Sequence, residues 1–204
     1  MQKAVRLTGF GIYSLLCIGV AGYAFYFLQM PVNPHNDFQQ KLLASGWEVP
    51  LHFYASGLAL LLIPLQLSRL IRKRWLSFHR YLGVVYALAV LTGGVAGLVM
   101  AFNASGGWVA RLGFTSLAVL WLGTTTLAVK CAIERNITRH QVWIYRSMAL
   151  TSGAITLRLF LGLGLGVFQL PFLTVYVPTS WLSWMLNLAI CEFILWQQRR
   201  SVVA

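Results

Sequence analysis

The hydrophobic pattern of the chain consists of six long apolar stretches separated by short polar segments. They cover about residues 7–29, 49–68, 80–102, 108–130, 142–168 and 175–196. Each is close to or above the roughly 20 residues that a helix needs to cross the hydrocarbon of a bilayer. Backbone polar groups in lipid must be satisfied within the segment, so each stretch is expected to be helical. The pattern therefore predicts an all-α polytopic transmembrane helical bundle with about six spans.

Composition agrees with this interpretation. Only 10% of the 204 residues are charged and 58% are hydrophobic, and the mean hydropathy is +0.71. A soluble domain carries roughly 25% charged residues, so the chain lacks the charge for a water-facing surface. The first stretch follows a basic N-terminus, as in a signal peptide, but its length favours an uncleaved span. No loop is long enough for a soluble domain, so residues 1–204 are expected to form a single membrane domain.

The basic residues indicate the orientation of the spans. Of the 16 lysines and arginines, 13 lie near the two ends of the chain or in and next to the loops that follow the second and fourth stretches. The three exceptions are Lys41, Arg111 and Arg158. Loops rich in Lys and Arg stay in the cytoplasm, so both termini are predicted to be cytoplasmic. This explains the net charge of +12 without nucleic acid as a partner, and no nucleic-acid-binding module is present. The same loops could attract anionic lipid headgroups.

Several polar residues lie within the apolar stretches. At 100° per residue, His140, Ser147, Thr151 and Arg158 fall on one face of the fifth stretch. Arg158 lies about 27 Å from His140 along the helix axis. An unpaired charge at such a depth is costly, so Arg158 is expected to face the bundle interior. The alternative is that Arg158 extends to the outer surface as an anchor.

The other stretches carry polar faces of their own. The second stretch places His52, Ser56 and Gln66 on one face, and the third stretch does the same with His79, Gly83, Tyr86, Gly93 and Gly97. Gly93 and Gly97 form a small-xxx-small pattern that lets a neighbouring helix approach closely. In the fifth stretch, leucine and glycine alternate over residues 161–166. This glycine run predicts a similar packing face at Gly162 and Gly166.

The sixth stretch contains Asn187 and Glu192. Glu192 lies about one turn from the inner end, at a depth near His79 and His140. It is therefore a natural counter-ion for one of these histidines or for Arg146.

His79 and His140 begin two spans at aligned positions of a weak internal repeat. Two imidazoles from neighbouring helices can ligate a haem iron, so this pair could hold haem b. The alternative is that each histidine is an interfacial residue bonded to a carbonyl, a carboxylate or a lipid phosphate. Nothing in the sequence indicates an enzyme, because it contains no nucleophile elbow, no HExxH and no phosphate loop.

An ordered series of short motifs carries a family resemblance. The motifs are LHF at 51–53, PLQ at 64–66, FHRYLG at 78–83, LW at 120–121, TT at 124–125, RHQVWIYRS at 139–147, TLR at 156–158 and NL at 187–188 with Glu192. Over about residues 50–195 the chain resembles the membrane-protein family called domain of unknown function 2306. The resemblance implies a multi-span protein of the bacterial cytoplasmic membrane and no particular activity, cofactor or substrate. The resemblance marks ten candidate positions: His52, Gln66, His79, Arg80, His140, Trp143, Arg146, Arg158, Asn187 and Glu192. The polar face of the third stretch adds Tyr86 as a further candidate.

Four functional hypotheses follow. In the first, the spans enclose a polar site that binds a small molecule, a lipid headgroup or haem. In the second, the protein transfers electrons through a haem on His79 and His140, with a quinone as partner. In the third, it is a small transporter in which Arg158 and Glu192 line an anion or proton path. In the fourth, it is an assembly factor for another membrane complex.

Overall fold

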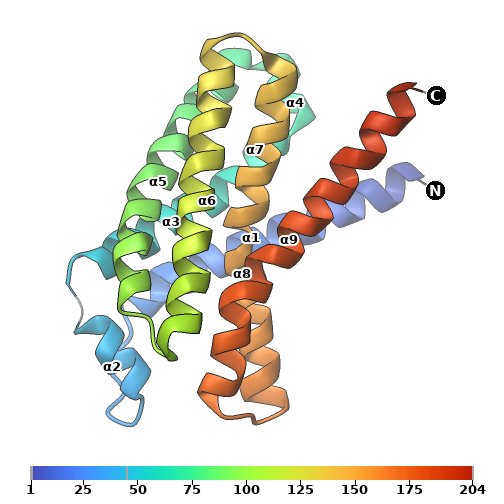
Figure 1. The fold of residues 1–204 in the computed structure, drawn as a ribbon. Helices are drawn as coiled ribbons and strands as arrows, with labels where there is room; N and C mark the ends of the chain where they lie inside the picture. The colour runs from blue at the N-terminus through green and yellow to red at the C-terminus, as the bar shows by residue number, and fades with distance from the viewer. Residues whose placement is uncertain (1, 45, 204) are drawn as a thin grey trace. The chain divides into compact units, whose positions relative to one another are not determined.

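A computed structural model describes residues 2–44 and 46–203 of the chain. The described residues form helices joined by short turns and contain no strand (Figure 1). The prediction of an all-α fold is therefore confirmed. The helices group into two compact units, residues 1–97 and 98–204, while the predicted assignment of the whole chain to one membrane domain stays a prediction.

The first five predicted spans are found as long apolar helical segments. Within the described residues, the segments long and apolar enough to cross a membrane are Leu7–Phe27, Glu48–Leu67, Leu76–Phe102, Gly107–Ile133 and Ile137–Val167. The sixth stretch lies in α9 (Phe172–Val203), which is long enough but is not among these five. It carries Pro178 and several polar side chains. Its crossing, like the orientation of the termini, stays a prediction.

The first unit contains α1 (Gln2–Phe27), α2 (Asp37–Leu43), α3 (Glu48–Leu67), α4 (Arg69–Arg74) and most of α5 (Leu76–Phe102). α1 packs along α3, and its small residues Cys17, Ala21 and Ala24 are buried. Gly57 of α3 makes room for Phe25, since a Cβ atom there would lie 2.5 Å from the Cε1 atom of the ring.

The predicted glycine face of the third stretch packs against α3. A Cβ atom on Gly97 would lie 2.8 Å from Nδ1 of His52, and one on Gly93 would lie 2.8 Å from Oγ of Ser56. Only a hydrogen in place of a side chain permits this approach. The small-xxx-small prediction is therefore confirmed, with α3 as the neighbouring helix.

The second unit is built from α6 (Gly107–Ile133), α7 (Ile137–Thr151), α8 (Gly153–Leu161), the π-helix η1 (Gly162–Val167) and α9. α6 and α7 form a hairpin, and α9 packs along α6, α7 and α8. Asn136 caps the N-terminus of α7, because its side chain accepts a hydrogen bond from the backbone N–H of Arg139. The predicted fifth span is thus interrupted at Ser152, between α7 and α8.

The glycine run adopts a different geometry from the one predicted. Its residues form a π-helix, in which Gly164 packs on α9. A Cβ atom on Gly164 would lie 2.6 Å from Cγ2 of Val175, whereas Gly162 and Gly166 have nothing within 4 Å in the described part of the chain. The predicted packing face at Gly162 and Gly166 is wrong, because a π-helix has more residues per turn than the α-helix assumed in the prediction.

Candidate functional site

The polar stripe of the fifth span faces α6 along α7. The hydroxyl oxygens of Ser147 and Thr125 are 2.6 Å apart, and the indole N–H of Trp121 donates to the Thr151 hydroxyl at 2.8 Å. All four side chains are buried. In hydrocarbon, such hydrogen bonds between helices replace the missing hydrophobic driving force for association. These stripe residues therefore hold the α6–α7 hairpin together.

His140 continues the stripe at the start of α7. Its Nδ1 atom lies 2.9 Å from the carbonyl oxygen of Ala128 on α6. A carbonyl only accepts hydrogen bonds, so Nδ1 carries a proton, and when the ring is neutral Nε2 keeps its lone pair. His52 has the same tautomer, because its Nδ1 lies 2.7 Å from the carbonyl oxygen of Gly93. Each of these rings is bonded to a backbone carbonyl of a neighbouring helix.

The remaining candidates of the first unit lie on α3 and α5. Gln66 is buried, and its side-chain amide donates to the backbone carbonyl of His79 at 3.0 Å. Tyr86 is fully buried, whereas Arg80 is exposed. His79 belongs to the first unit and His140 to the second, so their pairing around a haem stays a prediction.

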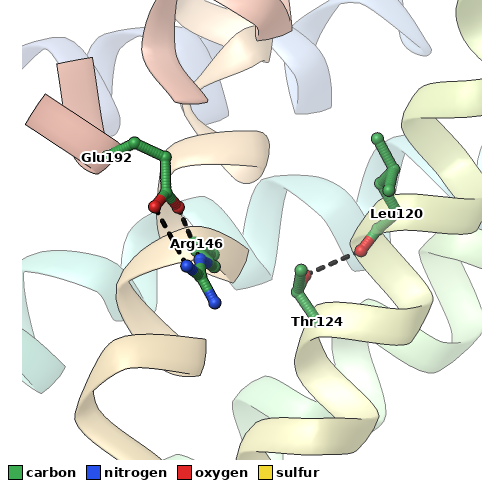
Figure 2. Close-up of polar contacts among 4 residues, drawn as sticks. All are labelled: Leu120, Thr124, Arg146 and Glu192. Atoms are coloured by element: carbon green, nitrogen blue, oxygen red, sulfur yellow. Dashed lines mark hydrogen bonds and ion pairs between the residues drawn. The ribbon is translucent and has the colours of Figure 1, made fainter. Parts of the chain in front are cut away.

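An ion pair joins α7 to α9 in the second unit. Figure 2 shows the guanidinium of Arg146 facing the carboxylate of Glu192, and the two make parallel hydrogen bonds of 2.5 Å (Nε to Oε1) and 2.9 Å (Nη2 to Oε2). Of the three partners considered for Glu192, the structure pairs it with Arg146. The figure also shows Thr124 of α6, whose hydroxyl donates to the carbonyl of Leu120 at 2.8 Å.

The surroundings of the pair are unequal. The guanidinium carbon of Arg146 lies 4.5 Å from the ring centroid of Trp143, one turn earlier on α7. This is a cation–π contact. The side chain of Arg146 is 20% exposed and that of Glu192 is 44% exposed. The site is thus a neutral pair. The guanidinium is bonded along one edge to Glu192 and lies over Trp143 with one face, and the carboxylate is the more exposed partner.

A second polar link in this unit joins α8 to α9. The Thr156 hydroxyl donates to the side-chain oxygen of Asn187 at 3.1 Å, and the Asn187 amide donates to the carbonyl of Ser183 at 3.0 Å. Arg158 is half-buried, and its Nη1 donates to the carbonyl of Ala154 at 3.0 Å. Arg158 is twelve residues from Arg146, about 18 Å of helical rise, so the two arginines belong to different levels of the unit.

Some participants in these contacts are not among the sequence-derived candidates. Trp121, Thr125 and Ser147 lie within motifs of the resemblance, but only the register of the hairpin shows that they meet. Ser183 is not among the sequence-derived candidates either. Its hydroxyl oxygen is buried and has no hydrogen-bond partner among the described residues. A lone serine in an apolar stretch gives no signal that could have identified it.

Comparison with known proteins identifies the family. The family model described as "Predicted membrane protein (DUF2306)" matches residues 49–195. The match begins in α3 and ends in α9, so it contains every candidate residue and leaves α1 outside. No curated protein and no solved structure matches the chain significantly. The matched range covers most of the chain, which therefore belongs to the DUF2306 family of membrane proteins.

Proposed function

We propose that this multi-pass membrane protein binds the acidic headgroup of an amphiphile, such as a lipid, at Arg146. The observation that carries the proposal is the incomplete use of the guanidinium. Two of its five N–H donors bind Glu192, and the other three bind no acceptor in the described part of the chain. An arginine that presents a free edge is the usual group for binding phosphate or carboxylate.

The depth of the site suits such a ligand. Arg146 lies nine residues after the start of α7, and Glu192 lies eight residues before the basic residue Arg200, which corresponds to about 14 Å and about 12 Å of helical rise. At this depth a lipid's acidic group can reach the guanidinium while its tail stays in hydrocarbon. We place the protein in the bacterial cytoplasmic membrane, with the site in the inner leaflet.

The alternative role for the pair is purely mechanical, as a clamp between α7 and α9. A clamp explains the two hydrogen bonds but makes no use of the remaining donors. The two roles predict different binding behaviour, which can be measured directly.

The test counts bound decanesulfonate on protein purified in a non-ionic detergent, by native mass spectrometry. We expect one saturable adduct on the wild type and none on Arg146→Gln/Glu192→Gln, in which two neutral amides preserve the packing. Arg200→Gln is the matched control, because Arg200 also stacks on a tryptophan, 4.0 Å from the ring centroid of Trp196, without a carboxylate partner in the described part of the chain. Equal binding by all three proteins would contradict the proposal.

A second candidate function is electron transfer through haem. It is favoured by the tautomer of His140, since ligating histidines commonly donate Nδ1–H to a carbonyl and bind the metal through Nε2. A bis-histidine haem gives a sharp α-band when reduced, which His79→Ala or His140→Ala should abolish. If folded, haem-supplemented protein shows no Soret band, electron transfer through haem is excluded, and a quinone partner is no longer expected.

A further inference from the structure

The charge balance at Arg146 limits what can bind there. Arg146 and Glu192 together are neutral, and a monovalent anion added to them would leave a net negative charge in a medium of low dielectric constant. Two anions held on one guanidinium also repel each other strongly at such distances. The ligand of the proposed function can therefore bind tightly only if one negative charge is removed.

The other cations on the two helices of the pair lie further away and in water. α9 packs against α6, α7, α8 and η1. Arg199 also acts on the charge of Glu192, but it lies seven residues further along α9, and Arg139 lies seven residues before Arg146 on α7, each about 10 Å of helical rise away. Both side chains are exposed, so solvent and salt screen their charges from a ligand at Arg146. Lys130 of α6 is paired with Glu134 at 3.8 Å, at an exposed helix end.

The other neighbouring groups do not change this balance. Arg158 of α8 lies twelve residues from Arg146, about 18 Å of helical rise away, and His140 of α7 donates to the carbonyl of Ala128. η1 contains only glycine, leucine and valine. Cys191, next to Glu192, is a neutral thiol in its ordinary state. Protonation of Glu192 is the change that frees Arg146 and cancels the extra charge.

Resting on the proposed function, we infer that Glu192 takes up one proton for each anionic headgroup that binds to Arg146. The proton forms an O–H bond on the carboxylate, and the two hydrogen bonds from the guanidinium pass to the ligand. The half-exposed carboxylate is open to a proton from water or from the ligand's own acid group. The site thus takes its ligand as anion plus proton, which is the composition of a neutral weak acid.

The experiment measures the Kd of decanesulfonate against pH. A sulfonate stays ionised throughout the range in which carboxylates and histidines titrate, so any pH dependence belongs to the protein. One coupled proton makes the affinity of the wild type fall about tenfold per pH unit as pH rises. Glu192→Gln should bind with a constant affinity equal to that of the wild type at low pH.

Glu134→Gln is the matched control, because it removes a carboxylate of the same unit that is paired with Lys130 instead. It should keep the pH dependence of the wild type. If the wild type and Glu192→Gln bind with the same pH-independent affinity, the coupling is overturned while the proposed function survives. If neither protein binds decanesulfonate at any pH, the proposed function itself fails.

Discussion

The side chains of Arg146 and Glu192, which are 46 positions apart in the sequence, meet through two parallel hydrogen bonds that tie α7 to α9. This contact is an ion pair between two different helices. The pair is both a structural link between α7 and α9 and the site of the proposed ligand. Variants that lack Arg146, Glu192 or both distinguish the structural role of the pair from its role in binding a ligand.

Arg146→Gln should be destabilising, because it leaves the Glu192 carboxylate without its cation. Removing one partner costs about 3–5 kcal/mol for a fully buried pair, and an exposed pair contributes only about 0–1 kcal/mol. Since Glu192 is 44% exposed, the loss should lie between these limits, at about 1–3 kcal/mol. Adding Glu192→Gln should restore part of the stability. Thermal unfolding of the two single variants and the double variant in detergent gives the coupling, and purely additive effects would show that the pair contributes nothing.

Gly97→Ala should weaken the packing of α5 on α3. The new methyl group would lie 2.8 Å from Nδ1 of His52, and overpacking of this kind typically costs about 1–3 kcal/mol. Gly123→Ala is the control, because a Cβ atom at that position in α6 would have no neighbour within 4 Å among the described residues, and alanine favours a helix by up to about 1 kcal/mol over glycine. A higher unfolding temperature for Gly97→Ala than for the wild type would contradict the close approach.

These sites show how far the sequence alone could lead. The positions of Gly93 and Gly97 were predictable because a regular α-helix places them on one face, and α5 is regular there. Gly164 was not, because a π-helix changes the angle per residue, and no residue pattern marks that change. The interruption at Ser152 was also missed. The Ser152 hydroxyl donates to the carbonyl of Met148 at 2.8 Å. Such a local bond cannot be predicted from the presence of a serine in an apolar stretch.

The partner of Glu192 shows a different limit. Depth in the membrane could be read from the sequence and placed Glu192 near three cationic or titratable residues. The choice among them depends on the rotation of α9 against α7. That rotation is fixed by packing of apolar side chains, and an apolar helix surrounded by lipid shows little periodicity from which to infer it.

The hydrogen bond between Trp121 and Thr151 should stabilise the α6–α7 hairpin. The donor and acceptor are 2.8 Å apart and buried, and hydrogen bonds between membrane helices average about 0.6 kcal/mol, with a maximum of about 1.7 kcal/mol. A double-mutant cycle with Trp121→Phe and Thr151→Val should give a coupling within this range. Trp108→Phe, which alters a highly exposed tryptophan of the same helix, should leave the unfolding temperature nearly unchanged. A coupling of zero would mean that the bond does not form in the membrane.

The last prediction concerns the sixth crossing, because α9 is not among the five segments that qualify by apolar composition. Its contacts with the preceding span nevertheless favour a crossing. Gly164 packs on Val175, Thr156 bonds Asn187, and Arg146 bonds Glu192. These pairs are spread along the fifth span in reverse order, so α9 runs antiparallel beside it over most of its length.

A helix that accompanies a membrane span in this way crosses the same bilayer in the opposite direction. Reporter fusions after Lys73, Glu134 and Arg200 should therefore report a cytoplasmic location, and fusions after Met30, Asn103 and Gln169 an external one. The fusions after Gln169 and Arg200 decide the point. If both report the same side while the other four agree with the prediction, α9 does not cross, and the Arg146–Glu192 pair could not lie at the depth that the proposed site requires.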